Sequence, residues 1–319
     1  MAEKEATKGA IPNALGREAA YQLTNVTKTA PQFGAITPRW ITQFLEFKGL
    51  EAGIYRVNKV VEGDTPLDVL CSQDPKKTEI PQGYIEYQTK PREYELNSIS
   101  TILNVDTKIT DVYSAPYNQT EEQVNLAIES LRERQESQLI NNDDYGLLKN
   151  VADSNRIQTR AGRPTPDDLD ELITKVWKDP SFFLAHPRAI AAFERECTRR
   201  GVPPVTVSVA GGTFIAWRGI PIIPTDKLFV DGLKNPKGKS GKTNILLVRS
   251  GESKRGVVGL FQAGLPGEQG RGLAVRFRGI NDQGVASYLL SLYCSAAILA
   301  DDAIAVLEDV EVGEYYDYQ

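Results

Sequence analysis

The sequence predicts an α+β chain in which strands and helices follow one another without regular alternation. Runs of β-branched and alternating apolar residues predict strands within 51–113 and 205–261. Segments with a capping residue and apolar residues at helical spacing predict helices over 118–140 and 165–177. Apolar residues make up 41% of the chain and charged residues 25%, which is typical of folded domains and excludes a largely disordered protein.

Composition also restricts the partners of the protein. Its 37 Lys and Arg against 42 Asp and Glu leave a net charge of −5, so the basic patch of a nucleic-acid-binding protein is not expected. No run approaches the roughly 20 apolar residues that cross a bilayer, and residues 1–20 contain no apolar core of a secretion signal. We therefore expect a cytoplasmic protein that binds neither nucleic acid nor membrane.

Residues 1–35 are polar and show no sustained hydrophobic period. They predict an N-terminal arm that becomes ordered only when it lies on a neighbouring subunit. The tetrapeptide that follows, from Thr37 to Trp40, has the form of a helix start, with Thr37 as the cap and Pro38 in the first turn. It predicts a short helix from Trp40 to Phe47.

Residues 53–105 predict a long extended hairpin. The run 54–61 is β-branched, 83–87 resumes the strand pattern, and 93–96 alternates charged with apolar residues. A hairpin of this length has few local partners to cover both faces, which favours a neighbouring chain as the cover. Its apolar positions are therefore predicted assembly contacts: Tyr55, Val57, Tyr84 and Tyr87.

A long helix is predicted over about 118–140. Asn118 is its expected cap, and Glu121 and Glu122 match the helix dipole. The apolar side chains at helical spacing form one face, and the charged ones are expected on the solvent side, namely Glu133, Arg134 and Glu136.

A change of composition at 162–164 precedes a strong helix start at Thr165, whose apolar stripe extends to Trp177. A further helix is predicted from Pro187 to about Arg199, with Gly201 following its C-terminus. Strands are predicted at 205–209, 213–217, 220–223, 244–248, 257–261 and 303–307. The nearly continuous apolar run 285–299 predicts a last, buried helix, and the tail from residue 301 is acidic.

The most suggestive chemical motif is the segment Gly238 to Thr243, which resembles a phosphate-binding loop. Such a loop needs a glycine at the position of Pro236 and a helix after the threonine, whereas 244–248 has a strand pattern. We expect instead an exposed, mobile basic loop over 234–243.

No catalytic, cofactor-binding or metal-binding residue is predicted. His186 precedes Pro187 at a helix start, so a capping role is expected. The acidic pairs are expected to cap helices rather than to hold a metal, and the cysteines are expected to pack in the core: Asp143/Asp144, Asp167/Asp168 and Asp301/Asp302, and Cys71, Cys197 and Cys294.

Several long segments of the sequence resemble shell proteins of the family 2A encapsulins. The resemblance covers about 22–310, and these segments carry it: 37–40 (TPRW), 51–60 (EAGIYRVNKV), 91–101 (PREYELNSIST), 164–193 and 256–262 (GVVGLFQ). It implies the fold of tailed-phage major capsid proteins. The span 60–83 leaves room only for a loop, so the related 2B branch with its inserted domain is excluded.

That fold implies a specific domain organisation. The arm is residues 1–35 and the E-loop is 53–105. The P-domain comprises 36–52 and 106–163 with a spine helix at about 118–140. The A-domain is 164–290, and 291–319 form the C-terminal return and acidic tail.

The resemblance also implies a function: self-assembly into an icosahedral shell around a cargo enzyme, typically a cysteine desulfurase linked to sulfur metabolism. No enzymatic activity of the shell subunit itself is implied. Two alternatives remain open at this point. One is a major capsid protein of a tailed phage or prophage, which shares the fold. The other is a nucleotide-binding enzyme that uses Lys242.

In the implied shell, A-domain tips meet at the five-fold axes. The segment between the helix from Pro187 and the strand from Val205 is the predicted tip loop, and its pore-lining residues are Arg200, Gly201, Val202, Pro203 and Pro204. Gly201 allows a reversal of the chain and the two prolines stiffen it. The alternative is an ordinary connection that lies away from any axis.

Overall fold

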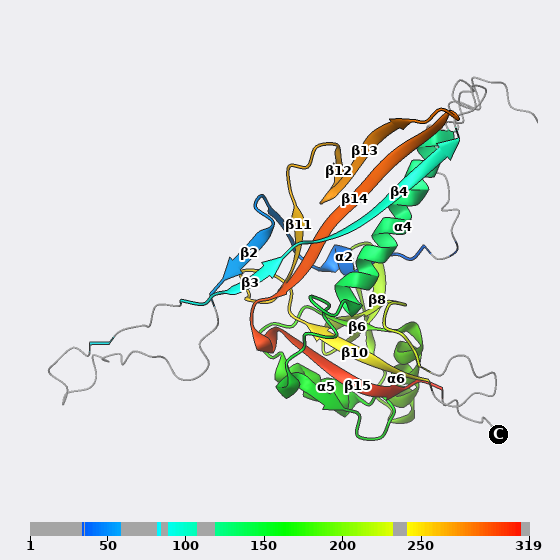
Figure 1. The fold of residues 1–319 in the computed structure, drawn as a ribbon. Coiled ribbons are helices and arrows are strands. Elements are labelled where there is room, and N and C mark those ends of the chain that lie inside the picture. Colours follow the sequence, from blue (N-terminus) through cyan, green and yellow to red (C-terminus); the bar gives the residue numbers. More distant parts are fainter. Residues whose placement is uncertain are drawn as a thin grey trace, which may run out of the picture. The chain divides into compact units, whose positions relative to one another are not determined.

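The computed structural model describes residues 34, 36–58, 82–83, 89–106, 119–231 and 241–313. The chain divides into two compact units. Unit 1 comprises 1–36, 100–132 and 275–290, and unit 2 comprises 37–99, 133–274 and 291–319. Figure 1 labels the elements.

Unit 2 contains a mixed sheet of seven strands among the described residues. Its order is β5 (Arg156–Gln158), β15 (Ile304–Glu311), β10 (Lys242–Val248), β6 (Phe182–Ala185), β9 (Ile220–Pro224), β8 (Gly212–Trp217) and β7 (Val205–Val209). The pairs β6–β9 and β15–β5 are parallel, and the other pairs are antiparallel. The strands predicted from the sequence in this region are confirmed.

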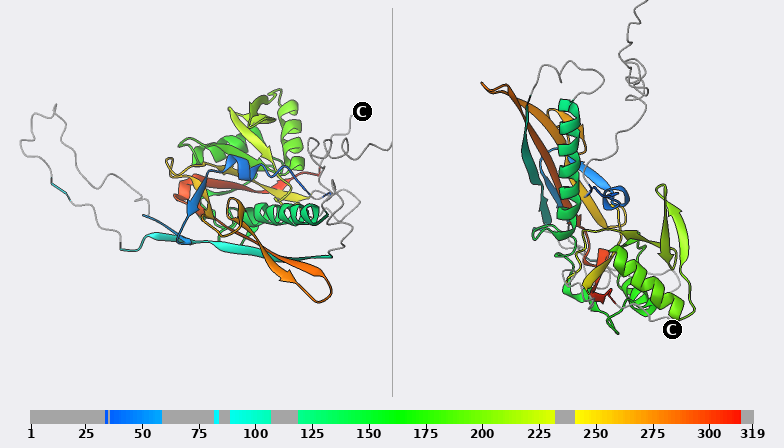
Figure 2. Two further views of the ribbon diagram at one scale, coloured as in Figure 1. Left: turned by 90° about the horizontal axis from the view of Figure 1, so that it is seen from above. Right: turned by 90° about the vertical axis from the view of Figure 1, so that its right-hand side faces the viewer.

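Both faces of the central strands β6, β10 and β15 are largely buried, which explains why these strands are apolar without alternation. On one face, Phe183, Ile245 and Leu307 pack with helices α5 (Pro166–Lys175) and α6 (Pro187–Arg199). Figure 2 shows both helices beside the sheet. On the other face lie the alternate residues, Leu184 and Leu246 among them.

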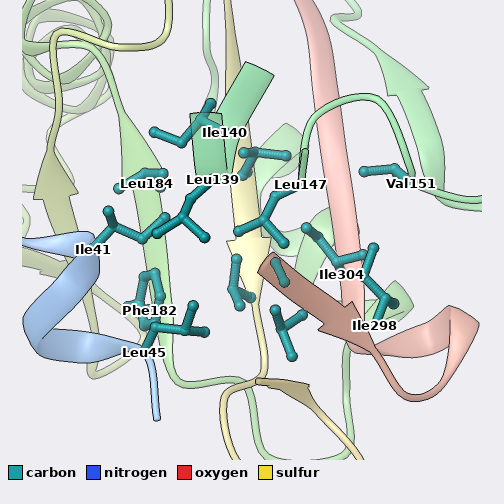
Figure 3. Packing of buried hydrophobic residues seen from close by; sticks show 14 of the residues in the cluster. Ile41, Leu45, Leu139, Ile140, Leu147, Val151, Phe182, Leu184, Ile298 and Ile304 are labelled. Carbon is teal, nitrogen blue, oxygen red and sulfur yellow. The ribbon is translucent and has the colours of Figure 1, made fainter. Parts of the chain in front are cut away.

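The second face forms a core with helix α2 (Ile41–Phe44) and the end of helix α4 (Gln119–Asn141). In Figure 3, Ile41 and Leu45 approach Phe182 from one side, and Leu139 and Leu147 lie next to them. Ile298 and Ile304 close the cluster from another strand and from β15. Each of these side chains is less than 9% exposed.

Local sequence accounts for both helices of the first face. Thr165 and Asp168 form a reciprocal capping box at α5, and Pro166 occupies the first turn. At α6 the Nδ1 atom of His186 accepts a hydrogen bond of 3.1 Å from the backbone N–H of Arg188. The capping roles predicted for Thr165 and His186 are therefore confirmed.

A second sheet has the order β1 (Phe47–Leu50), β11 (Val257–Gln262), β14 (Val285–Ile298), β13 (Leu273–Ile280) and β12 (Glu268–Gly270), with β4 (Asn97–Asp106) paired to β14. In the part of this sheet that belongs to unit 2, Phe47 of β1 lies opposite Gly259 of β11. A Cβ at residue 259 would stand 2.5 Å from the Phe47 ring, so only glycine permits this pairing.

The prediction of a helix over 285–299 is wrong, because these residues form the long strand β14. Near its end, Ala296 and Ile298 enter one core cluster, whereas Ala297 and Leu299 enter another. Where both faces of a strand are buried, as at this end of β14, apolar residues need not alternate with polar ones, and such an apolar run does not distinguish a strand from a buried helix.

The predicted long helix is confirmed as α4, although its expected cap, Asn118, lies outside the described residues. Its first half belongs to unit 1, where Ile128 and Leu131 are buried. Also in unit 1, the Ser287 hydroxyl of β14 donates to the Asn104 side chain of β4 at 2.7 Å. Phe277 and Tyr288 pack ring to ring at 5.4 Å.

The base of the predicted hairpin is present in unit 2. Strand β2 (Ile54–Val57) pairs antiparallel with β3 (Arg92–Glu95), with Tyr55 opposite Tyr94. The hairpin tip over 59–81, the run 84–88 and the arm over 1–33 lie outside the described residues.

Three further predictions need correction. The helix expected over 40–47 is only α2, since β1 already begins at Phe47. Trp177 follows α5 and is 67% exposed, because the helix ends before the last apolar position of its stripe. Thr243, expected in a mobile loop, is buried in β10, whereas 232–240 lie outside the described residues.

Candidate functional site

The predicted tip loop connects α6 to β7. The backbone N–H of Arg200 donates to Glu196, and that of Val202 donates to Cys197 at 2.9 Å, so the loop closes tightly over the end of α6. Gly201 has φ +69, a conformation that favours glycine. Residues 200–203 are exposed, Val202 at 46%.

The charge of this loop is balanced. The Arg200 guanidinium donates to the Asp167 carboxylate of α5 at 2.7 Å, and both side chains are exposed. Beyond the loop, β7 is the last strand of its sheet and presents Val205, 64% exposed, to solvent. The structure thus places the exposed apolar side chains of Val202 and Val205 near Arg200, whose charge is neutralised by Asp167.

The base of the hairpin is held by a polar contact of Tyr55. Its hydroxyl donates to Glu252 at 2.6 Å, and the Lys48 ammonium binds the same carboxylate at 2.6 Å and lies 5.1 Å from the Tyr55 ring. Burial and the hydrogen bond to Glu252 raise the pKa of Tyr55. The hydrogen bond from Lys48 holds the pKa of Glu252 below its usual value.

These contacts correct one premise of the sequence analysis. Tyr55 is only 7% exposed and Val57 packs against the same cluster, so part of the hairpin base is covered by its own chain. The reason is that β2 and β3 pack on the end of β14, where Leu299 lies in the shared cluster. Tyr84 and Tyr87 lie outside the described residues, and the assembly role of all four remains a prediction.

A polar cluster joins the segment before α2 to helix α4. The backbone N–H of Thr37 donates to Glu133 at 2.8 Å, and its hydroxyl donates to Glu133 at 3.0 Å and to Glu136 at 3.4 Å. Thr37 therefore does not cap α2, whose N-cap position is Trp40 without a side-chain hydrogen bond. Its polar atoms instead anchor the chain to α4.

Lys227 supplies the positive charge of this cluster. Its ammonium lies 2.7 Å from Asp226 and 2.9 Å from Glu133, and the side chain is 11% exposed. Burial works against its charge, but the hydrogen bonds to Asp226 and Glu133 outweigh it and raise the pKa of Lys227. Arg39 lies farther away, 3.9 Å from Glu133.

Glu136 is the exceptional member of the cluster. It was expected on the solvent side of α4, yet it is 1% exposed. Burial raises the pKa of its carboxyl to about 7, although the charge of Lys227 opposes the shift. Among the described residues, no Lys or Arg forms an ion pair with Glu136.

A pocket of about 210 Å³ opens beside this cluster. Three prolines and Trp40 contribute to its walls: Pro38, Pro187 and Pro224. Trp40 packs edge to face on Phe214 at 5.1 Å, which holds the indole in place. Glu136, Asp226 and Arg39 are also among the lining residues, but almost all of the accessible surface of the pocket is apolar.

The burial of Glu136 was not predicted from the sequence. The signal was present in its spacing, because Glu136 precedes Leu139 and Ile140 by three and four residues and so shares their face of α4. The roles of Lys227 and Glu252 were not predicted either, because both residues contact partners about 90 or more residues away in sequence.

Within the described part of the chain, no group of residues suits a metal ion, and no helix is long and apolar enough to cross a membrane. Cys197 and Cys294 are buried and unpaired, as expected for packing residues, whereas Cys71 lies outside the described residues. Lys242 begins a strand and lies 3.3 Å from Asp309, an arrangement that differs from a phosphate-binding loop.

Comparison with known proteins gives a consistent result. The family described as SrpI-like type 2A encapsulin shell proteins matches residues 55–314. The type 2A encapsulin shell protein SrpI of Synechococcus elongatus is 55% identical over 313 residues, which cover 98% of this chain and 99% of that protein. A type 2A encapsulin shell protein of Mycolicibacterium paratuberculosis is 53% identical over 306 residues, covering 96% and 97% of the two chains.

Solved structures agree. The cryo-EM structure of the holo-SrpI encapsulin complex from Synechococcus elongatus superimposes with a TM-score of 0.77 at 53% identity, covering 96% of this chain and 99% of that chain. The capsid of a native GTA particle gives a TM-score of 0.56 at 13% identity, with 93% and 100% covered. At that identity the likeness concerns the fold alone, which is the fold of phage-type capsid proteins.

Proposed function

Because this chain belongs to the SrpI-like family of type 2A encapsulin shell proteins, we propose that it assembles with copies of itself into a closed icosahedral shell in the cytoplasm. The observation that carries the proposal is the 55% identity over 98% of the chain to the SrpI shell protein. A phage capsid role has weaker support, since the capsid likeness lies at 12–13% identity. The subunit itself acts as a structural component and not as an enzyme.

The shell encloses a cargo enzyme, and we propose a cysteine desulfurase tied to sulfur metabolism. The support is the family membership, together with the solved relative that is described as a holo complex. The cargo docks through a peptide-like segment. Grooves around the proposed P-domain, which includes α4, are the proposed location.

Five copies of the loop Arg200, Gly201, Val202, Pro203 and Pro204 line a pore at each five-fold axis. The exposure of this loop and the tight turn at Gly201 support the assignment. Because Arg200 is paired with Asp167, we propose a rim with little net charge, which selects solutes mainly by size.

Electron microscopy of the purified full-length protein tests the shell. Uniform hollow particles are the expected result, and a monomer in solution contradicts the proposal. Removal of residues 1–35 tests the arm and is expected to weaken or abolish particles. Wild-type-like particles from that variant would contradict its role.

Co-expression of the shell protein with a cysteine desulfurase whose gene neighbours the shell gene tests the cargo separately. Particles filled with the enzyme are expected, as judged by density inside the shell and by co-purified activity. Empty particles of normal shape under these conditions count against the cargo while leaving the shell intact.

A further inference from the structure

We propose that Glu136 is a proton-dependent latch: in its protonated form it fastens the segment 37–41 to helix α4, and loss of its proton releases that segment. The segment directly follows the proposed arm, residues 1–35, in the chain. The latch itself is independent of the proposed function, whereas its consequence for the shell rests on the proposed role of the arm.

The first argument is the set of contacts that Glu136 makes with this segment. One of its carboxyl oxygens lies 3.4 Å from the Thr37 hydroxyl, and the backbone N–H of Ile41 donates to the same carboxyl group. The side chain is 1% exposed, so water does not take the place of either contact while the segment is bound. Glu136 therefore fastens both ends of the segment to α4.

The second argument is a count of protons. The Thr37 hydroxyl has one proton to donate and two carboxyl groups within reach, Glu133 at 3.0 Å and Glu136 at 3.4 Å. Glu133 is the ionised acceptor, because the Lys227 ammonium lies 2.9 Å from it. A protonated Glu136 then donates its own proton to the Thr37 oxygen. With Glu136 ionised, this chain of hydrogen bonds lacks one proton and two carboxylates face one hydroxyl.

The third argument is the charge that surrounds Glu136. Burial is the main cause that raises the pKa of its carboxyl to about 7, and the charges of Glu133 and Asp226 act in the same direction. The charge of Lys227 opposes them, but its ammonium also binds Glu133 and Asp226. Arg39, on the segment itself, lies 3.9 Å from Glu133. The protonated form of Glu136 is therefore populated close to neutral pH.

The groups at the start of α6 do not account for a change above pH 7. His186 interacts with Arg188 and Asp226, and burial holds the pKa of its imidazole below the usual value. His186 is therefore already neutral at pH 7, and Arg188 stays charged throughout this range. Glu136 is the member of this group whose charge changes between pH 6 and pH 8.

The direction of the effect follows from the two states of the segment. While the segment is bound, the pKa of Glu136 is about 7, and once it is released, water reaches the carboxyl and the pKa returns toward 4.5. Ionisation therefore favours the released state. The equilibrium constant for release is expected to increase about tenfold between pH 6 and pH 8.

Hydrogen–deuterium exchange of the full-length protein measures this release. The readout is the exchange of the backbone amides of 41–45, corrected for the intrinsic effect of pH on exchange. Exchange of these amides in the wild type is expected to increase about tenfold from pH 6 to pH 8. The amides of the buried strand β6 are the internal reference and are expected to stay protected at both pH values.

Variants assign the effect to the latch. Glu136→Gln is the matched variant, because its amide donates to Thr37 at every pH as the protonated carboxyl does, and no increase is expected. Glu129→Gln, on the same helix but outside this cluster, is expected to keep the wild-type increase. If Glu136→Gln does not fold, Thr37 supplies the test: Thr37→Ser is expected to behave as the wild type, and Thr37→Val to exchange severalfold faster at pH 6.

Equal exchange of the wild type at pH 6 and pH 8 overturns the proposal, as does the same increase in Glu136→Gln or wild-type exchange in Thr37→Val. Electron microscopy of the same samples tests the consequence for the shell. Fewer intact wild-type particles are expected at pH 8 than at pH 6, and equal numbers would contradict that consequence. A protein that forms no particles but shows the expected exchange supports the latch and contradicts the shell, so the two failures are distinguishable.

Discussion

Glu136 is a residue whose ionisation the fold changes strongly. An exposed glutamate is ionised at neutral pH, whereas burial raises the pKa of this carboxyl to about 7. The folded protein therefore holds the proton of Glu136 more tightly than the unfolded chain does. Stability contributed by this group is complete below about pH 4.5 and is lost as the pH rises through 7.

Replacing Glu136 with Gln is expected to flatten the pH dependence of unfolding. The stability of the variant relative to wild type is expected to increase by roughly 2 kcal/mol between pH 5 and pH 8, because the cost of ionising a buried carboxyl disappears. Thermal unfolding at several pH values measures this difference. Glu129→Gln is the control, and a parallel pH profile for wild type and Glu136→Gln would contradict the expectation.

The two buried cysteines are expected to resist thiol reagents. Burial raises the pKa of the Cys197 thiol to about 11 and that of Cys294 to about 12, so almost no thiolate exists at pH 8. Treatment of native particles with a maleimide, followed by peptide mass mapping, is expected to find both residues unmodified. After denaturation both are expected to react, and modification of either in native particles would contradict the described packing.

At the scale of elements, the sheets depend on close approaches that only certain residues permit. The parallel pair β1–β11 is the clearest case, because the Phe47 ring lies over the backbone of Gly259. Bulk at residue 259 displaces that ring and separates the strands.

Gly259→Ala is expected to lower stability by roughly 2 kcal/mol, since the added Cβ would lie 2.5 Å from the Phe47 ring. The double variant with Phe47→Leu is expected to recover part of the loss, and Phe47→Leu alone serves as the control. Chemical denaturation of the three variants measures the coupling. Additive losses in the double variant would show that the two residues do not interact as described.

At the scale of the whole molecule, assembly determines which exposed surfaces matter. The loop after α6 and the edge strand β7 present Val202 and Val205 to solvent in the single chain. Apolar exposure of this kind is what copies arranged around an axis would cover or would use to line an opening.

Replacing Val202 and Pro203 with Gly is expected to widen and loosen the proposed five-fold pore, because both rigidity and side-chain volume are lost. The measurement is the rate at which a small thiol reagent reaches a thiol enclosed in the shell, and an increase is expected. Glycine at Val209 and Ala210, at the other end of β7, controls for general loosening. Unchanged access through intact shells would place the pore elsewhere.

Much of this protein was determined by local sequence. Apolar spacing predicted α4, and capping residues such as Thr165 and His186 also predicted α5 and α6, because the residues that begin a helix are close together in the sequence. Edge strands next to turns were also predicted correctly from the sequence, as at 205–209. The long distinctive segments also indicated the shell family, which the identity to known relatives confirms.

Only the tertiary structure decided the remaining features. The later part of strand β14 is buried on both faces, so its sequence there carries no period that separates it from a buried helix. Thr37, Glu136 and Lys227 meet from segments about 90 or more residues apart, and Tyr55 meets Glu252 in the same way. Burial and the pKa of a side chain depend on such distant partners, because a charge is stabilised by what the fold places around it and not by its neighbours in sequence.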